Sequence, residues 1–430
     1  MTVKKLIEKI EGEAELDFRF NNGIIEDVKI GFGFYRGIED IMVGKAPRDA
    51  LVITPRVCGI CNHAHLMAAV HAIENGYESV GIDVSLSDKA KQIREFTLAC
   101  ELIQNHIKWL YMTIIPQFEK LTGMEKRENH ALKASYLSTT ITKALAIFAG
   151  QWPHSSYAVP GGVTCDPTYV DVMQAQALLD EAVRFFEQMM TGMDLETYLA
   201  ISSVSSLSEI GGDVGRLLHL LGTHGMANKG HSHDRFIVFG EGLSFASGKS
   251  IATKVSNVDI RYVDETMQSG TYAKAVTYKN RQYETGPLAR GMIRKIPIIK
   301  SLHKRYKDSL LTRVFARIHE VALLLEEAQG LLRSLDVREP SCTLESRLLA
   351  GTFEGVGCVE AARGSLIHKT VVKEGKIDRY EIIVPTQWNL SHGTPEEKGV
   401  AVAAMLGSAS TEEASFIFRT FDVCSVCTTQ

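Results

Sequence analysis

The chain has 430 residues, of which 45% are hydrophobic and 23% charged, a composition typical of a folded globular protein. Its 47 Lys and Arg residues face 51 Asp and Glu residues, for a formal net charge of −4, and the basic residues are scattered. This argues against nucleic-acid binding, which favours a concentrated basic surface. Because no apolar run is long enough to cross a bilayer and residues 1–13 lack the apolar core of a secretory signal, we expect no direct membrane span.

The first part of the chain predicts a β-hairpin followed by helices. Residues 13–20 and 24–30 alternate in part between apolar and polar side chains, and Asn21-Asn22-Gly23 between them favours a tight turn. Apolar residues then recur at helical spacing. Helices are predicted at residues 66–73, stopped by Asn75-Gly76, at 98–110, ending at Pro116, and at 169–199 and 310–335.

The last part predicts a second hairpin, with strands at residues 366–372 and 379–384 joined at Glu374-Gly375. No internal repeat or linker divides the chain. We therefore expect one domain, residues 1–430, that is mainly α-helical with small peripheral antiparallel β-sheets. Its predicted parts are an N-terminal hairpin region at about 10–35, a helical body at about 58–335, and a C-terminal hairpin and tail at about 360–430.

Two Cys-x-x-Cys pairs lie near opposite ends of the chain. Cys58 and Cys61 form one pair, and Cys424 and Cys427 form the other. In a chain of this size such pairs suggest metal or redox chemistry more than a disulfide framework. Four thiolates suit zinc, an iron–sulfur cluster, or nickel with iron, and the whole fold would have to bring the pairs together.

The cysteine pattern leaves other interpretations open. The first pair could be a thioredoxin-like dithiol, although no βαβ pattern frames it, or half of a zinc site. The second pair could lie in a disordered tail, but the apolar residues 414–421 before it indicate that the tail is anchored. Four further cysteines stand singly, and we expect them to be small buried hydrophobic side chains: Cys100, Cys165, Cys342 and Cys358.

Both pairs lie in longer motifs that resemble those of nickel–iron hydrogenase large subunits. Arg56-Val57-Cys58-Gly59-Ile60-Cys61, with His65 beyond it, resembles the family's R-x-C-G-x-C-x-x-x-H motif. Asp422-Val423-Cys424-Ser425-Val426-Cys427-Thr428-Thr429-Gln430 resembles its D-P-C-x-x-C-x-x-H motif. Further blocks follow the family's order: Arg36-Gly37-Ile38-Glu39, Pro160-Gly161-Gly162-Val163, Gly286-Pro287-Leu288-Ala289-Arg290, Glu360-Ala361-Ala362-Arg363-Gly364 with His368, and Val384-Pro385-Thr386-Gln387-Trp388-Asn389. The context of Pro160 resembles the uptake and sensory branch.

The resemblance implies a Ni–Fe centre buried in a compact multi-helix body. In the family, nickel takes all four thiolates and iron shares two of them. Carried onto this sequence, Cys58 and Cys424 are terminal ligands of nickel, and Cys61 and Cys427 also bridge to iron. The remaining ligands of iron in the family are carbon monoxide and cyanide.

The resemblance also implies reversible heterolytic cleavage of H2, in which a base takes the proton. Cys424 is one candidate base. Arg363 would position hydrogen over the open metal site, since a guanidinium resists deprotonation, and Asp422 would pair with it. Glu11 matches the family glutamate that passes the proton outward. Without the surrounding motifs, Arg363 would be interpreted as a surface or salt-bridge residue and Glu11 as solvent-exposed.

Other residues match supporting positions of the family. His65 would hydrogen-bond Cys427 and tune the metal. Pro385 and Thr386 would line the diatomic ligands, with Thr386 donating a hydrogen bond to cyanide. Glu39 and Gln430 match positions that bind Mg²⁺ or a similar oxygen-ligated ion.

The sequence departs from the family's pattern at several of these positions. Val423 and Gln430 stand where Pro and His are usual, Ala362 replaces a usual Pro, and Asn105 replaces an Asp near Arg363. The amide oxygen of Gln430 can still ligate a hard metal. The family's maturation protease normally cuts at this point, so the sequence is either the processed form or one that never had an extension.

No iron–sulfur motif remains once the four cysteines are used. The resemblance therefore implies a small subunit that carries iron–sulfur clusters, in a heterodimer compatible with higher oligomers. We expect H2 uptake in the cytoplasm, with membrane association only through partners and export through the small subunit as the alternative. An H2-sensing regulatory hydrogenase, a non-catalytic structural relative in an electron-transfer complex, and a four-thiolate zinc protein remain alternative functions.

Overall fold

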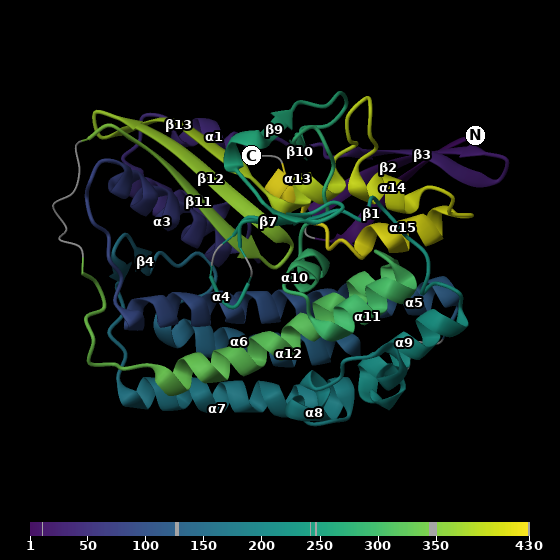
Figure 1. Ribbon diagram of the computed structural model, residues 1–430, viewed down its shortest axis with the longest axis horizontal. Coiled ribbons are helices and arrows are strands. Elements are labelled where there is room, and N and C mark those ends of the chain that lie inside the picture. Colours follow the sequence, from purple (N-terminus) through teal and green to yellow (C-terminus); the bar gives the residue numbers. More distant parts are fainter. Residues whose placement is uncertain (11, 125–128, 241, 246, 344–350, 429–430) are drawn as a thin grey trace.

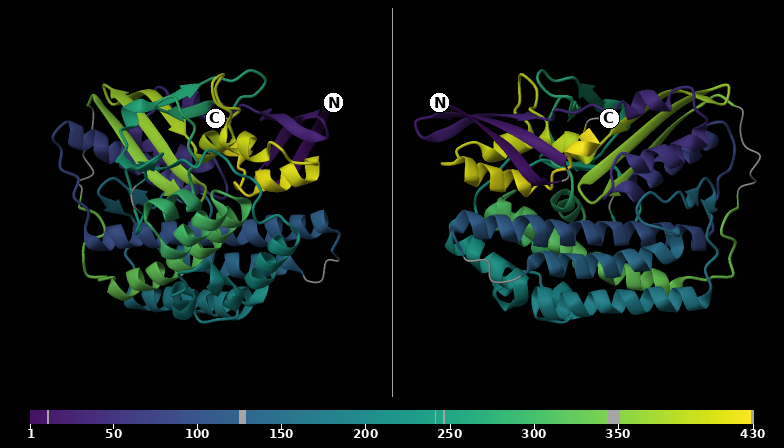
Figure 2. Two further views of the ribbon diagram at one scale, coloured as in Figure 1. Left: turned by 45° about the vertical axis from the view of Figure 1, so that its right-hand side comes forward. Right: turned by 180° about the vertical axis from the view of Figure 1, so that it is seen from behind.

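The structure, a computed structural model, describes residues 1–10, 12–124, 129–240, 242–245, 247–343 and 351–428. Four long helices form one layer (Figure 1): α4 (Asp88–Lys108), α6 (His130–Ala149), α7 (Tyr169–Phe185) and α12 (Leu310–Ser334). The N-terminal and C-terminal segments lie together over this layer, and Figure 2 shows the same division from two other directions.

The remaining helices are shorter, apart from α3: α1 (Ile38–Met42), α2 (Ala50–Ile53), α3 (Asn62–Ser79), α5 (Ile115–Thr122), α8 (Leu195–Leu199), α9 (Gly212–Thr223), α10 (Pro287–Ile293), α11 (Pro297–Tyr306), α13 (Pro385–Leu390), α14 (Val400–Met405), α15 (Thr411–Arg419) and α16 (Ser425–Thr428). No helix among the described residues is long and apolar enough to pass through a membrane.

All strand pairs are antiparallel. The strands are β1 (Thr2–Ile10), β2 (Gly12–Asn21), β3 (Ile24–Gly31), β4 (Ala158–Val159), β5 (Gly162–Val163), β6 (Phe236–Val238), β7 (Lys249–Ile251), β8 (Val255–Asn257), β9 (Val263–Thr266), β10 (Ala275–Tyr278), β11 (Phe353–Ala361), β12 (Gly364–Lys373) and β13 (Lys376–Ile383). The expected class, mainly α with small antiparallel sheets, is confirmed.

Both predicted hairpins are present, and each is part of a three-stranded sheet. Strands β2 and β3 match the first hairpin, and β1 adds a strand that the charged residues before it did not indicate. Strands β12 and β13 match the second, and β11 adds its third strand. The second sheet is largely buried and lies against α3, so it does not fit the expectation of a purely peripheral sheet.

Helix α3 continues to Ser79, so the predicted stop at Asn75-Gly76 is wrong. Gly76 serves close packing, because a Cβ atom there would lie 2.3 Å from the Phe353 ring. Gly355 and Gly357 on β11 likewise approach α3, where added Cβ atoms would meet the carbonyl oxygens of Ala72 and Ala68 at 1.9 and 2.0 Å. These glycines bring the sheet directly against the helix that begins after Cys61.

Two other predicted helix boundaries also shift. The helical path continues beyond Pro116, because α4 passes through a π-helical turn at Trp109–Ile114 into α5, where Pro116 occupies the first turn and its missing N–H is tolerated. The predicted helix at 169–199 ends in a second π-helical turn before left-handed Gly192, and α8 follows. The helix predicted at 310–335 is confirmed as α12.

Candidate metal centre

The fold brings the four cysteines of the two pairs together. Cys58 and Cys61 lie just before α3, Cys424 directly precedes α16, and Cys427 lies within α16. The Sγ atoms of Cys58 and Cys424 are 3.6 Å apart, those of Cys61 and Cys427 are 3.5 Å apart, and all four lie within 4.8 Å of one another. This is the only group of at least three Cys, His, Asp or Glu side chains with metal-binding geometry among the described residues.

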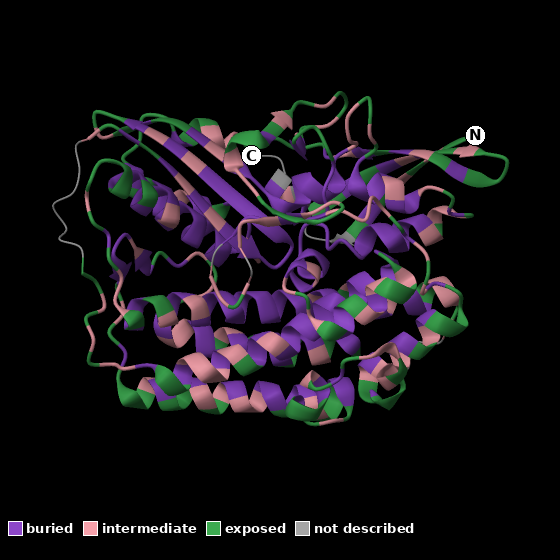
Figure 3. Ribbon diagram, in the orientation of Figure 1, coloured by how far each residue is buried: buried purple, intermediate pink, exposed green. Residues whose placement is uncertain are grey.

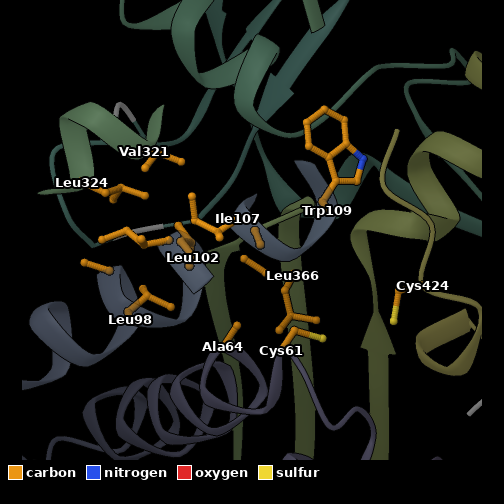
Figure 4. Packing of buried hydrophobic residues seen from close by; sticks show 14 of the residues in the cluster. Cys61, Ala64, Leu98, Leu102, Ile107, Trp109, Val321, Leu324, Leu366 and Cys424 are labelled. Carbon is orange, nitrogen blue, oxygen red and sulfur yellow. The ribbon is translucent and has the colours of Figure 1, made fainter. Parts of the chain in front are cut away.

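The cluster is enclosed by the hydrophobic core. All four cysteines are buried, and Figure 3 shows buried residues continuing along the inner faces of the surrounding helices and sheet. Figure 4 shows Cys61 and Cys424 on different segments, with Cys61 next to the apolar side chain of Leu366. Burial raises the pKa of Cys424 and of Cys427, because a thiolate without a counter-charge is poorly solvated there. Four buried sulfur donors therefore fit a soft or borderline metal cation, which would stabilise the thiolates.

Two residues to which the sequence motifs assigned no role hold the cysteine segments in place. The guanidinium of Arg36 donates hydrogen bonds to the carbonyl oxygens of Val57 and Val426, and so ties the first pair to the second. The buried carboxylate of Glu101 accepts hydrogen bonds from the backbone N–H groups of His63 (2.7 Å) and Ala64 (2.9 Å) at the start of α3. Burial raises the pKa of Glu101 to about 8.

Arg363 is held beside the cysteines by the C-terminal segment. Its Nε donates to the carbonyl oxygen of Asp422 at 3.0 Å, and its Nη2 lies 3.2 Å from Asp422 Oδ1. Its other terminal nitrogen contacts the amide oxygen of Asn105 at 3.5 Å. Asp422 has a second cationic partner, because Nη1 of Arg317 lies 3.0 Å from Oδ2. The expected pairing of Arg363 with Asp422 is thus present, and two arginines share one carboxylate.

A chain of buried polar groups extends from Arg317 away from the cysteines. Arg317 contacts His106 at 3.1 Å, and His106 contacts Glu320 at 2.9 Å. Glu320 pairs with Arg290, which also pairs with Glu360 at 2.9 Å. Because every charged group in this chain has an opposite partner, the attraction between partners offsets the cost of desolvating the buried charges. Arg290 and Glu360 were noted only as parts of motifs in the sequence.

His65 makes a contact that differs from the expected one. Its Nδ1 lies 3.1 Å from Nε2 of His368, which in turn contacts the hydroxyl of Tyr380 at 2.9 Å. No hydrogen bond joins His65 to Cys427 in the described part of the structure. His65 makes this contact through Nδ1, because β12 packs against α3 and brings His368 next to it.

Pro385 and Thr386 begin α13, which packs against α16. The Thr386 hydroxyl is buried and has no hydrogen-bond partner among the residues that the structure describes. A buried hydroxyl is rarely left unpaired in a folded protein, so this one is available to a group bound next to α16. The packing of α13 against α16 brings these two residues toward the second cysteine pair, and their expected place beside the diatomic ligands stays a prediction.

The expected oxygen-ligated ion site has a different arrangement. The carboxylate of Glu39 faces Lys274, whose Nζ lies 3.3 and 3.1 Å from its two oxygens. Burial lowers the pKa of Lys274, but the carboxylates of Glu265 and Glu39 together raise it above its ordinary value. The other predicted ligand, Gln430, and the predicted proton acceptor, Glu11, lie outside the described residues.

The single cysteines were expected to be buried. Cys100 is buried, but Cys165 and Cys358 are only partly buried, and Cys342 is exposed. The prediction for Cys342 is wrong because this residue follows Pro340 on a connecting segment after α12, where little packs over it. None of these four joins a second metal-binding cluster among the described residues.

Comparison with known proteins agrees with this geometry. A family model described as nickel-dependent hydrogenase matches residues 36–115, 126–276 and 252–430, which include both cysteine pairs. The large subunit of the periplasmic [NiFeSe] hydrogenase of Desulfomicrobium baculatum is 25% identical, covering 89% of this chain and 84% of the relative. The coenzyme F420 hydrogenase subunit alpha of Methanothermobacter thermautotrophicus is 26% identical, covering 97% and 92%.

Solved structures share the fold. The reduced Ni-Fe-Se hydrogenase of D. vulgaris Hildenborough superimposes with a TM-score of 0.86 at 22% identity, covering the full length of both chains. The reduced, active Ni-Fe-Se hydrogenase of Desulfomicrobium baculatum does so with a TM-score of 0.84 at 22% identity. The family match confirms the expected enzyme class, an oxidoreductase that acts on H2. Because the match covers most of the sequence and both cysteine pairs, this chain belongs to the nickel-dependent hydrogenase family.

Proposed function

We propose that the chain is the catalytic subunit of a nickel–iron hydrogenase and that Cys58, Cys61, Cys424 and Cys427 hold its Ni–Fe centre. The observation that carries this proposal is the enclosed group of four sulfur atoms within 4.8 Å of one another. Cys424 contacts both Cys427, at 2.8 Å, and Cys58, at 3.6 Å, and Cys61 contacts Cys427 at 3.5 Å. The terminal roles on nickel proposed for Cys58 and Cys424, and the bridging roles to iron proposed for Cys61 and Cys427, are carried over from the family motifs. When bound, the metals would polarise H2 and accept its electrons.

Arg363 would orient H2 and keep its surroundings positively charged. Its guanidinium is fixed by two contacts with Asp422, and it is 5% exposed. A rigid, always-charged donor can hold a small substrate in one position without itself releasing a proton. Asp422 then acts as a positioning residue for Arg363. Cys424 is the better candidate to take the proton, and Glu11 is proposed to carry it outward.

Carbon monoxide and cyanide are proposed as the further ligands of iron. The unpaired, buried hydroxyl of Thr386 supports this, because a cyanide nitrogen would give it an acceptor. Pro385 offers only a carbonyl and a hydrocarbon ring, which suits the side of an apolar carbon monoxide. His65 would act more indirectly than expected, by positioning the start of α3 through His368.

We propose an iron–sulfur small subunit as the electron-transfer partner. An apolar hollow of about 510 Å³, lined in part by Phe34 and Tyr35, reaches Val426, the residue before Cys427. Phe34 is 67% exposed and Tyr35 51% exposed, and Val426 separates Cys424 from Cys427. Exposed aromatic side chains of this kind favour burial by another protein. A cluster held there would receive electrons over a short distance.

The working direction is proposed to be H2 uptake, within a heterodimer or an oligomer of heterodimers. An H2-sensing subunit would contain the same cysteine cluster but turn over slowly. A non-catalytic relative would have no reason to retain four buried sulfur donors in contact, which weighs against it.

Infrared spectroscopy and metal analysis of the purified complex test the proposal. We expect bands from carbon monoxide and cyanide that shift under H2, one nickel and one iron at the cysteine site, and H2-dependent dye reduction when the partner is present. One zinc per chain without nickel, together with absent bands, would overturn the proposal. Normal bands with very slow dye reduction would favour the sensing role.

A further inference from the structure

The site expected to bind magnesium contains a lysine. Glu39, in the first turn of α1, faces Lys274, which directly precedes β10. Lys274 also lies 3.3 Å from Oε1 of Glu265 on the neighbouring strand β9. Side chains of all three residues are mostly enclosed, at 16%, 22% and 15% exposure for Glu39, Lys274 and Glu265. Figure 1 shows the hairpin β9–β10 on the same side of the molecule as α1 and β13.

The ammonium group occupies the space that an ion bound to Glu39 would need. Its nitrogen lies 3.3 and 3.1 Å from the two carboxylate oxygens, so it faces both of them. The backbone N–H of Ile382 on β13 also donates to Oε1 of Glu39, at 2.8 Å. Mg²⁺ requires near-octahedral oxygen ligands at about 2.0–2.1 Å and retains several waters. A lysine in contact with the same oxygens excludes that shell and repels a second cation.

The hairpin fixes the lysine in this position. In the register of β9 and β10, Glu265 is opposite Val276, two residues after Lys274. The strand pairing therefore places Glu265 next to Lys274, and Glu39 of α1 is the second carboxylate that contacts this lysine. Oε1 of Glu265 is buried and makes no hydrogen bond of good geometry, so the positive charge of Lys274 is its main compensation.

We propose that Lys274 is a built-in cation that takes the place of the divalent ion at Glu39, so that this subunit binds no magnesium there. The residues present do not fit the ion that the family resemblance implies. The proposal concerns charge compensation between α1, β13 and the β9–β10 hairpin. It does not depend on how the Ni–Fe centre works, and it can be tested on protein without nickel.

The test compares wild-type protein with Lys274→Ala in the presence of the partner subunit. After dialysis against a chelator, we expect the wild-type protein to hold well under one magnesium, calcium or manganese ion per chain. We expect the same of iron beyond the iron of the Ni–Fe centre. The melting temperature of the wild-type protein should not change with millimolar MgCl2. In Lys274→Ala two mostly enclosed carboxylates lose their cation. The melting temperature should therefore fall, and should then rise with the logarithm of the MgCl2 concentration.

Two further variants serve as a control for the loss of a lysine and as a substitute for Lys274→Ala. Lys229→Ala removes a lysine that pairs with Glu413 and not with Glu39 or Glu265, and MgCl2 should not change the melting temperature of this variant. Lys274→Gln keeps a donor at the site, and is the substitute if the alanine variant does not fold. One tightly held divalent ion per wild-type chain, or a magnesium-dependent wild-type melting temperature, would overturn the proposal. So would a folded Lys274 variant that magnesium leaves unchanged.

Discussion

Asp422 illustrates how a single carboxylate can organise a buried, positively charged site. It contacts both Arg363 and Arg317, while the neighbouring Asn105 supplies only a neutral amide. Its backbone has a left-handed φ of 59°, a conformation that Asp tolerates better than most residues. The negative charge next to Arg363 and Arg317 therefore comes from Asp422.

Asp422→Asn should reduce both H2 oxidation and stability. The amide cannot neutralise two buried guanidinium groups, and breaking a buried ion pair costs about 3–5 kcal/mol of unfolding free energy. Arg363 would lose its fixed orientation, so we expect kcat to fall by about 10²-fold, the scale of losing one preorganised donor. Dye-reduction kinetics and thermal melts measure these effects. Asp336→Asn, at an exposed pair with Arg338, is the control, and equal losses in both variants would contradict the assignment.

Thr386→Val tests the role of an unpaired hydroxyl. Because Oγ1 has no hydrogen-bond partner in the described part of the chain, its removal should leave the melting temperature nearly unchanged, while the cyanide band in the infrared spectrum shifts. The matched control is Thr97→Val, whose hydroxyl bonds the Ile93 carbonyl and contacts the Tyr157 hydroxyl, and whose loss should cost about 1–3 kcal/mol. An unshifted band in Thr386→Val would remove the proposed contact with cyanide.

At the scale of elements, glycine has two different structural roles in this chain: it ends helices, and it allows close packing. Gly192 ends a helical segment in a left-handed conformation, as sequence reasoning expects of glycine. Gly76 lies inside α3, where it admits the ring of Phe353. The two uses cannot be separated from local sequence, since the Phe353 partner is far away in the chain. This is why the hairpins and α12 were predicted well and the end of α3 was not.

Gly76→Ala should destabilise the protein although alanine favours helices. The new Cβ would lie 2.3 and 2.6 Å from two carbons of the Phe353 ring, and such overpacking costs about 1–3 kcal/mol. Gly330→Ala in α12 is the control, because nothing lies within 4 Å of its added Cβ. In Gly330→Ala only the higher helix propensity of alanine should act, and it should stabilise the folded protein by up to about 1 kcal/mol. Chemical denaturation of both variants distinguishes them, and a stabilised Gly76→Ala would contradict the packing argument.

At the scale of the whole molecule, the metal centre joins two ends of the chain that the fold brings together. The motifs around the cysteines and Arg363 could be recognised because their spacing is local. Arg36 and Glu101 could not be assigned roles, since their partners depend on the tertiary fold: Arg36 bonds the carbonyl of Val426, 390 residues away. The lysine at Glu39 was missed for the same reason, because Lys274 is 235 residues from its partner.

Metal removal should therefore loosen both ends of the chain but not its helical layer. A metal that binds only the folded arrangement stabilises the contact between residues 58–61 and 424–427 by mass action. Without it, four buried thiols keep only weak contacts with one another, and the ordinary hydrogen bonds from Arg36 remain. In hydrogen–deuterium exchange, nickel-free protein should exchange faster in both cysteine segments, while the buried middle of α12 stays protected. Equal protection of the cysteine segments in both forms would mean that the fold alone holds the site closed, and that the metal enters a preformed cage.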